Sequence, residues 1–300
     1  MKKIGPIKVI PGEKNSRFPY CTSLLLENNG SFALIDPGAG YFLKNLSIQE
    51  IYLTHYHYDH VWGVNLFLNN VPIFINQEDL PALSELGEFA SRLGARQYFG
   101  NEYVGWWSKE IKKGGFLAPS LSPYNRPDII TVIETPKNIY PSDEEITLLG
   151  IKTIFLKAPG HSPGYVFPYF PEHGVIYTGD YDLTSFGPFY MSADGDIDLF
   201  IQSAQVLRMV DAQYFITGHE EGILERKHFL IKLVAFLEII DQREDKIKSL
   251  ISKGYSLEEI ADSSIFYPVK FQKIDPWVRM WEILGIKKHL KRLGLMSQVS

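Results

Sequence analysis

Residues 4–36 alternate between short apolar runs and turn-forming residues, which is the pattern of an antiparallel sheet. Apolar side chains dominate residues 7–10, 23–27 and 32–35. The last two runs are separated by Asn-Asn-Gly at 28–30, and an Asn-Gly step between apolar runs is a strong signal for a tight hairpin. The sequence therefore predicts that the chain opens with paired β-strands.

Farther along the chain, strand and helix periodicities alternate. Short apolar runs bounded by Gly and Pro predict buried strands, whereas apolar positions three and four apart predict helices. The expected strands cover residues 51–53, 71–75, 146–156, 174–178 and 214–217, and the expected helices cover residues 61–68, 77–86 and 198–210. This mixture predicts an α+β fold.

Residues 87–137 interrupt that alternation and are rich in aromatic and basic side chains. They contain Tyr98, Phe99, Tyr103, Trp106, Trp107, Phe116 and Tyr124, together with Arg92, Arg96 and Arg126. Two interpretations are open: an insertion that forms a lid or wall beside a functional site, or amphipathic helices that pack on the body. Aromatic side chains supply much of the buried area in any segment, so their presence does not choose between the two.

The segment 223–300 has a helical pattern. Apolar positions over 229–247 predict a long amphipathic helix, a capping box at 256–259 opens a second helix, and Pro276 suits the first turn of a third. The segment holds 14 Lys and Arg against 10 Asp and Glu. Its end, residues 285–295, resembles the last helix and turn of a winged-helix-like unit, and the alternative is a helical cap with a solvated basic face.

The composition narrows the classes of function. A formal net charge of −5 gives the whole chain no general attraction to nucleic acid or to an anionic membrane. The single cysteine, Cys21, excludes an intramolecular disulfide framework, and its place before an apolar strand favours a small buried side chain over a reactive thiol. Neither a signal peptide nor a membrane-spanning segment is expected, so we expect a cytoplasmic protein.

Candidate chemistry is concentrated at residues 54–60, Thr-His-Tyr-His-Tyr-Asp-His, which directly follow an apolar run. Side chains alternate along an extended segment, so His55, His57 and Asp59 point one way while His60 leaves that line. Imidazole and carboxylate groups at this density suit zinc or another divalent first-row metal. The segment can therefore serve two adjacent ions, with the first two histidines on one and the last two residues on the other.

This segment resembles the His-x-His-x-Asp-His signature of the metallo-β-lactamase fold hydrolases. The family implies further ligands in a fixed order, and the chain supplies His161 after Ala-Pro-Gly, Asp180 after Tyr-Thr-Gly, and His219 after Ile-Thr-Gly. The family also implies an upstream aspartate, which is Asp36 in Leu-Ile-Asp-Pro-Gly. The resemblance extends over about residues 18–222.

The resemblance implies a site for two divalent metal ions, with zinc expected first and iron or manganese as alternatives. The implied ligands are His55, His57 and His161 for one ion, Asp59, His60 and His219 for the other, and Asp180 as the bridge. Two such cations would acidify a bridging water to hydroxide. We assign catalysis to Asp59 and Asp180, and we expect Asp36 to organise the loop behind the ligands.

The strand pattern independently favours a gathered site. A short apolar run precedes each of four candidate ligands: His55, His161, Asp180 and His219. Ligands at the ends of several strands collect at one edge of a sheet, on loops held by a rigid core. The resemblance implies a four-layer αββα sandwich, which we place at residues 1–222 with the insertion at about 87–137, and a C-terminal helical region at 223–300.

The activity implied by the resemblance is hydrolysis of a small ester, thioester or lactone, as in the glyoxalase II and lactonase branches. Histidine at position 57, where flavodiiron-type relatives have glutamate, favours hydrolysis over redox chemistry. Three alternatives are open: a phosphodiesterase or endoribonuclease that binds RNA through the basic C-terminal region, a mononuclear iron dioxygenase, and a non-catalytic binding protein. The expected partner is a small-molecule substrate, with a homodimer as an additional expectation.

Some residues near the predicted site depart from the family pattern, and others are candidates for a role in binding or catalysis. Trp62 replaces a small residue and is expected to narrow or line the site. Glu220 and Glu221 follow the last histidine and disfavour a polyanionic substrate. Tyr181 and Tyr190 are candidates for hydrogen bonding to a developing oxyanion, and loop packing is the alternative for both.

Overall fold

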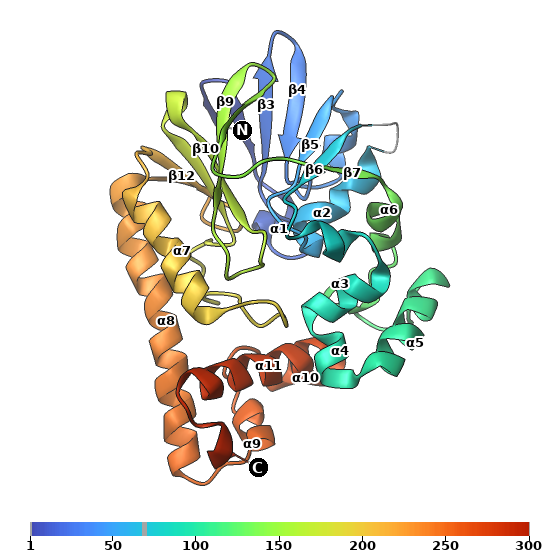
Figure 1. Cartoon of the computed structure of the whole chain (residues 1–300), viewed down its shortest axis with the longest axis vertical. Coiled ribbons are helices and arrows are strands. Elements are labelled where there is room, and N and C mark those ends of the chain that lie inside the picture. The colour runs from blue at the N-terminus through green and yellow to red at the C-terminus, as the bar shows by residue number, and fades with distance from the viewer. Residues whose placement is uncertain (1, 68–70, 300) are drawn as a thin grey trace.

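The computed structural model describes residues 2–67 and 71–299. Two β-sheets lie face to face, and helices cover the outer side of each (Figure 1). A group of helices from the end of the chain lies at the lower end of the view. The α+β fold class, the sandwich of four layers and the C-terminal helical region are therefore confirmed.

The first sheet has seven strands in sequence order, antiparallel from β1 to β4 and parallel from β4 to β7. They are β1 (Lys2–Ile4), β2 (Ile7–Ile10), β3 (Ser23–Asn28), β4 (Ser31–Ile35), β5 (Glu50–Tyr52), β6 (Ile73–Ile75) and β7 (Lys137–Ile139). Asn29 and Gly30 both take positive φ between β3 and β4, so the predicted Asn-Gly hairpin is confirmed.

The second sheet has six strands in the order β13-β12-β11-β10-β9-β8. They are β8 (Glu145–Leu148), β9 (Ile151–Lys157), β10 (Val166–Phe170), β11 (Val175–Gly179), β12 (Tyr214–Thr217) and β13 (Ile223–Glu225). The single strand predicted at 146–156 is wrong, because Leu149 and Gly150 take φ of 48° and 84° and reverse the chain between β8 and β9.

The helices lie on the outer faces of the sheets, in the insertion at 87–137 and in the C-terminal region at 223–300. The α-helices are α1 (Glu13–Ser16), α2 (Tyr58–Val61), α3 (Leu86–Leu93), α4 (Ala95–Phe99), α5 (Asn101–Lys112), α6 (Ile129–Glu134), α7 (Ile197–Met209), α8 (Arg226–Ser252), α9 (Leu257–Asp262), α10 (Val269–Ile274) and α11 (Pro276–Arg292). Short 3-10 helices are η1 (Tyr41–Asn45), η2 (Trp62–Leu66), η3 (Leu80–Leu83), η4 (Pro123–Asn125), η5 (Pro171–His173) and η6 (Met296–Gln298).

Two helix predictions need correction. The helix predicted at 77–86 is wrong: only the 3-10 turn η3 forms there, because Asn76 holds a turn by accepting the Glu78 N–H (2.9 Å) and Pro81 lacks an N–H. The helix predicted at 61–68 is split into α2 and η2, and Leu68 lies outside the described residues. The helix predicted at 198–210 is confirmed as α7.

The two-residue period of the strands separates two apolar clusters. Leu24 and Leu26 on β3 point between the sheets, whereas Leu25 points to the outer helices. Between the sheets, buried residues of both meet: Val9, Ala33, Ile35, Phe155, Val166, Tyr177 and Ile216. This dry interface fixes the ends of the strands relative to one another, and the loops that leave those ends inherit that rigidity.

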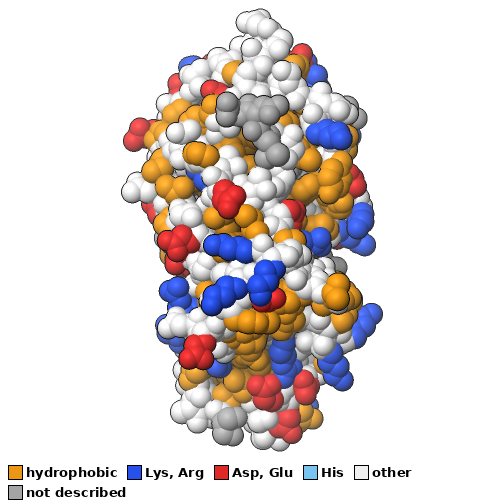
Figure 2. All heavy atoms as spheres, turned by 90° about the vertical axis from the view of Figure 1, so that its right-hand side faces the viewer, with side chains coloured by type: hydrophobic (Ala, Val, Ile, Leu, Met, Phe, Trp, Pro, Cys, Tyr) orange, Lys and Arg blue, Asp and Glu red, His pale blue; other side chains and the backbone are white. Residues whose placement is uncertain are grey.

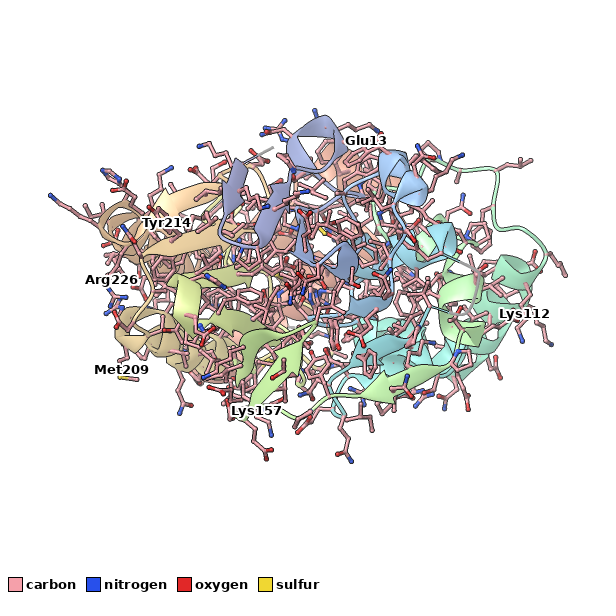
Figure 3. The ribbon with its side chains drawn as sticks, turned by 90° about the horizontal axis from the view of Figure 1, so that it is seen from above. Glu13, Lys112, Lys157, Met209, Tyr214 and Arg226 are labelled. Atoms are coloured by element: carbon pink, nitrogen blue, oxygen red, sulfur yellow. The ribbon has the colours of Figure 1, made fainter. Side chains whose placement is uncertain are left out.

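The insertion packs on the C-terminal region. The rings of Trp107 on α5 and Trp277 on α11 are 4.9 Å apart, and Trp281 Nε1 donates to the Leu93 carbonyl at 2.8 Å. Helical packing of the insertion is thus confirmed. Seen from above, Lys112 of α5 and Met209 of α7 lie at opposite ends of the molecule (Figure 3).

The C-terminal region is helical throughout its regular elements. The capping box of Ser256 and Glu259 and the helix start at Pro276 are confirmed. The winged-helix expectation is wrong, since no strand follows Glu225 in the described residues up to 299. β13 extends the second sheet three residues past the predicted boundary at 222, and the division into two units stays a prediction. None of the described helices has the length and apolarity needed to cross a membrane.

Candidate metal centre

The candidate ligands meet where four strands end. His55 follows β5 of the first sheet, and His161, Asp180 and His219 follow β9, β11 and β12 of the second sheet. The structure gathers all seven predicted ligands into two groups whose ligand atoms lie within 4.8 Å of one another: His55, His57, His161 and Asp180 in one, and Asp59, His60 and His219 in the other.

Asp180 lies between the two groups. Its Oδ2 is 2.8 Å from His161 Nε2, and its Oδ1 is 2.7 Å from His60 Nε2 and 3.3 Å from His219 Nε2. Asp59 Oδ2 is also 3.3 Å from His219 Nε2. One carboxylate oxygen of Asp180 therefore faces each group, as a bridging ligand requires.

Hydrogen bonds behind the histidines fix which nitrogen faces the centre. His60 Nδ1 donates to Asp36 Oδ2 (2.7 Å), His161 Nδ1 donates to the Phe189 carbonyl (2.8 Å), and His219 Nδ1 donates to the Ser16 carbonyl. These acceptors cannot donate, so the proton is on Nδ1 in each ring. Each Nε2 then presents a lone pair to the centre, which is the form that binds a metal.

Asp36 connects two of the ligands through one carboxylate. It accepts from the Thr54 N–H (2.8 Å), the Thr54 hydroxyl (2.7 Å) and His60. Because the Thr54 hydroxyl donates to Asp36, it is an acceptor for His55 Nδ1 at 3.0 Å. The expectation that Asp36 organises the loop behind the ligands is confirmed. The roles of Thr54 and of the two backbone carbonyls were not predicted, since no side-chain pattern signals a carbonyl.

Two glycines let the loops approach closely. A Cβ on Gly38 would lie 1.9 Å from the Asp59 carbonyl oxygen, and a Cβ on Gly63 would lie 1.6 Å from the Pro37 carbonyl oxygen. The loop after β4 therefore rests directly on the backbone of α2 and η2. This contact holds the ligand segment in place and tolerates no larger side chain at either position.

The electrostatics suit a bound cation. Burial lowers the pKa of His55 and of His57 well below the usual histidine range, so both rings are neutral ligands. Burial opposes a charge on His219 as well, but hydrogen bonds from a second proton, on Nε2, to Asp180 and Asp59 raise its pKa well above that range, and a cation that binds here takes the place of that proton. The two carboxylates thus draw positive charge to this point.

Two buried polar atoms of the ligand groups have no hydrogen-bond partner in the described residues, which also favours a bound metal. His60 Nε2 and Asp180 Oδ1 are buried, and each lacks a hydrogen-bond partner in the described part of the chain. Buried polar atoms without partners are costly, and a cation between them would satisfy both. Imidazole nitrogens and carboxylate oxygens in these numbers match zinc and other divalent first-row ions.

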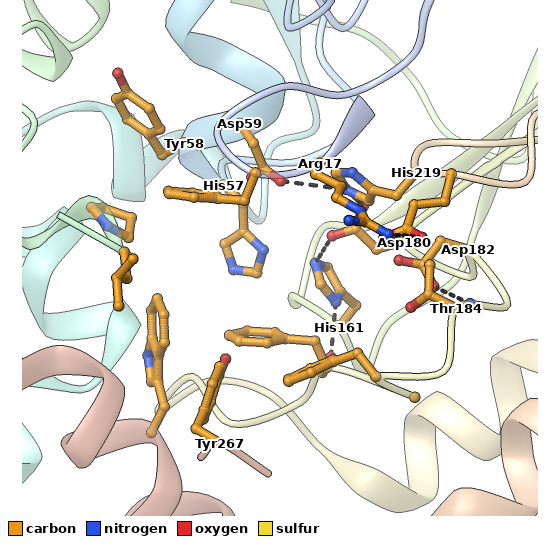
Figure 4. A pocket seen from close by; sticks show the side chains of 18 of the residues that line it. Arg17, His57, Tyr58, Asp59, His161, Asp180, Asp182, Thr184, His219 and Tyr267 are labelled. Atoms are coloured by element: carbon orange, nitrogen blue, oxygen red, sulfur yellow. Dashed lines mark hydrogen bonds and ion pairs between the residues drawn. The ribbon is translucent and has the colours of Figure 1, made fainter. Parts of the chain in front are cut away.

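The ligands open into a cavity of about 280 Å³. Its apolar side is lined by residues of the insertion, the loop after β11 and the C-terminal region: Leu93, Leu121, Pro123, Phe186, Phe189, Tyr267 and Trp281. Tyr267 lies across the pocket from Arg17, Asp182 and Thr184, with His161 between them (Figure 4). The insertion thus forms a wall beside the ligands, in addition to packing on the body.

Other residues singled out from the sequence have different positions from those expected. Trp62 is buried against Tyr20 and Tyr41 and does not line the cavity, so that expectation is wrong. Tyr181 donates to the Phe200 carbonyl (2.8 Å), and Tyr190 is fully buried against Arg243. Their proposed oxyanion role is wrong, and loop packing is confirmed for both.

The acids after His219 are paired with cations that were not predicted. Arg17 Nε donates to Glu220 Oε1 at 2.8 Å, and Lys232 lies 2.6 Å from Glu221. Of the lysines and arginines in the described ranges, Arg17 is the one that lines the cavity, and this pairing neutralises it. The cavity therefore offers little attraction to a polyanion.

Comparisons with known proteins agree with this geometry. Probable metallo-hydrolases of Streptococcus pyogenes serotype M6 and Bacillus subtilis strain 168 are 26% and 24% identical over 166 and 170 residues, which cover 52% and 51% of this chain. The matches cover 59% and 56% of the relatives, so the chain spans less than two thirds of their length.

A metallo-β-lactamase family protein of Thermus thermophilus has the same fold. It superposes with a TM-score of 0.64 at 18% identity, over 96% of this chain and 94% of that one. The family model described as metallo-β-lactamase superfamily matches residues 17–219, which is more than half of the 300 residues. The chain belongs to the metallo-β-lactamase superfamily.

Proposed function

We propose that this protein is a metal-dependent hydrolase of a small ester, thioester or lactone, with two divalent ions held by the seven ligands. The observation that carries the proposal is the pair of ligand groups on either side of Asp180, at the base of a largely apolar cavity. The matched relatives, named probable metallo-hydrolases, support hydrolysis as the reaction class.

The first ion would be held by His55, His57 and His161, and the second by Asp59, His60 and His219, with Asp180 shared. When bound, the two cations lower the pKa of a shared water to about 7, so that it supplies hydroxide, and they polarise the scissile group. Zinc fits the donor set best, with iron and manganese as alternatives. The negative charges of Asp59 and Asp180 would hold the two cations beside the substrate.

The other residues of the site orient the imidazole ligands and exclude water from part of the cavity. The bonds from Asp36, Thr54 and the Phe189 carbonyl hold three imidazoles in one tautomer, so the ligand atoms need no reorganisation when a cation binds. The apolar side of the cavity excludes water from one face of the scissile bond, which strengthens electrostatic interactions there.

The paired charges favour a carboxylic ester over a phosphodiester. A phosphodiester substrate would bring a negative charge to a cavity that already contains three aspartates, and Arg17 is engaged by Glu220. In the C-terminal region, Arg243 and Lys288 are bound to backbone carbonyls. On the face shown in Figure 2, basic side chains are interspersed with acidic and apolar ones. These features support a small-molecule substrate rather than RNA.

The proposal is tested by hydrolysis assays on metal-loaded protein with p-nitrophenyl esters, acyl thioesters, lactones and bis-p-nitrophenyl phosphate. We expect turnover of one or more carboxylic substrates, loss of turnover after chelation, and recovery with zinc, iron or manganese. Turnover of the phosphodiester alone, or oxygen consumption by an iron-loaded protein without hydrolysis, would contradict the proposal.

A further inference from the structure

We propose that the substrate of this site carries an apolar acyl group, which lies against a wall formed by Leu93, Leu121, Phe189, Tyr267 and Trp281, and a polar leaving group at the opposite end of the cavity. This inference rests on the proposed function and specifies its substrate class. Hydrolysis adds one water across the acyl C–O or C–S bond and yields a carboxylic acid and an alcohol or thiol.

The wall presents mostly carbon surface to the cavity, and Tyr267 adds one hydroxyl that points into it (Figure 4). Trp281 Nε1 is already bonded to the Leu93 carbonyl, so its indole offers only apolar faces and edges to a ligand. Its ring meets that of Phe189 edge-on at 5.2 Å and lies 6.4 Å from that of Tyr267. Such an array binds mainly through burial of apolar area, with the Tyr267 hydroxyl as its one polar group.

Two buried carboxylates of the C-terminal region hold the wall in place. Asp275, at the start of α11, accepts from the Leu121 N–H (3.0 Å) and the Ser122 hydroxyl (2.8 Å). Glu282 accepts from the Ile265 and Tyr267 N–H groups at 2.6 and 2.7 Å. Both carboxylates are fully buried. The wall is therefore formed before a ligand arrives, and binding loses little conformational entropy there.

The opposite end of the cavity is polar and open. It is lined by Arg17, Asp182, Thr184 and Glu220, and the side chain of Arg17 is 67% exposed. Trp281 at the wall is 6% exposed. The alcohol or thiol that departs is polar, so the exposed polar end suits it, and the apolar end suits the acyl group, which leaves as the carboxylic acid. His57 and His161 lie between the two ends, and His219 lies at the polar end beside Arg17, which supports this orientation (Figure 4).

The experiment compares p-nitrophenyl esters of increasing acyl length on metal-loaded wild-type protein and two matched variants. Leu121→Ser shortens the wall at a side chain that is 38% exposed, and Leu117→Ser changes a fully exposed leucine on the same loop that does not line the cavity. Both positions are accessible to solvent, so neither change opens a cavity in the core.

We expect kcat/KM to rise about fourfold per added methylene until the chain fills the cavity. Leu121→Ser should lower the ratio of hexanoyl to acetyl ester kcat/KM by roughly five- to tenfold, and Leu117→Ser should leave that ratio unchanged. A wild-type preference for the acetyl ester, or an unchanged ratio in Leu121→Ser, would overturn the inference.

A binding measurement separates this inference from the proposed function. By calorimetry, 2-octanone, a neutral acyl analogue that cannot be hydrolysed, should bind the metal-loaded protein more tightly than acetone, and Leu121→Ser should reduce the difference. That result supports the apolar subsite even if no ester is turned over, in which case only the proposed function fails. Equal binding of the two ketones, together with ester turnover that ignores chain length, overturns the inference and leaves the proposed function standing.

Discussion

The ligand cluster and the apolar wall face each other across one cavity, but they are built in different ways. The ligands lie in short sequence motifs just after strand ends, and their hydrogen-bond partners range from the adjacent Thr54 for His55 to the distant Ser16 carbonyl for His219. The wall joins Leu93 of α3, Leu121 of the insertion and Trp281 of α11, which are far apart in the chain. The candidate ligands are thus positioned by short motifs on a rigid edge, whereas the wall is assembled by tertiary packing.

Substitution of Asp180, which both ligand groups share, should disrupt the metal site most. In Asp180 one carboxylate oxygen faces each ligand group, and Asp180→Asn removes the negative charge and replaces one of these two oxygens with an NH₂ group. We expect a loss of activity beyond the roughly 10–100-fold cost of altering a residue behind a metal ligand, together with loss of bound metal. Metal analysis and ester assays measure both. Asp198→Asn, at an exposed position on α7, is the control and should retain metal and activity; a fully metallated, active Asp180→Asn protein would exclude the bridging role.

A weaker change in the same cluster acts from behind the ligands. Asp36→Asn would replace an acceptor oxygen that serves Thr54 and His60, and would disturb the imidazole orientation without removing a ligand. Metal affinity should fall about 10–100-fold, as measured by competition with a chromogenic chelator. An unchanged affinity would show that the backbone alone holds these ligands.

The wall should respond to a change that leaves the metals bound. Asp275→Ala would leave the N–H groups of Leu121 and Trp277 and the Ser122 hydroxyl without their acceptor. We expect a loss of about 2–3 kcal/mol in the free energy of unfolding, measured in urea, and a smaller preference for long acyl chains. Metal content should match wild type. If metal is lost as readily as in Asp36→Asn, cluster and wall are not independent.

The smallest expected effect is on pH dependence. His289 of α11 is buried beside Tyr190, Glu244, Arg243 and Arg292, and burial lowers its pKa to about 4 despite the hydrogen bond to Glu244, which raises it. The unfolded chain binds a proton at this ring near pH 6.5 and the folded chain does not, so stability falls as pH drops from 6.5 toward 4. Wild type should lose about 1 kcal/mol more than His289→Gln between pH 6.5 and 5.5. Parallel curves for the two proteins would contradict this assignment.

The sequence predicted the fold and the gathered ligands because both depend on local patterns. Apolar runs mark the strands, and a candidate metal ligand follows four of them, β5, β9, β11 and β12, within a few residues. The errors arose where a local pattern was overridden. Leu149 has the pattern of a strand residue but lies at positive φ in a turn, and Trp62 was expected at the site but is turned toward Tyr20 and Tyr41.

A wall formed by the insertion was one of two interpretations of the sequence, but the share of the C-terminal region in that wall was not predicted. Trp281 lies on a helix whose pattern is equally consistent with a core residue, and only the contact with Leu93 brings it to the cavity. Arg17 likewise reaches the site through Glu220, a partner 203 residues away. Contacts between distant segments carry no periodic signal, so the sequence did not place these side chains at the cavity.

The most direct test of the central claim is the metal content per chain of protein purified without added metal, measured on the same sample as ester hydrolysis. We expect about two divalent ions per chain, with activity that disappears as the ions are removed by a chelator and returns as they are restored. One ion per chain in a fully active sample would contradict a site in which Asp180 joins two ions.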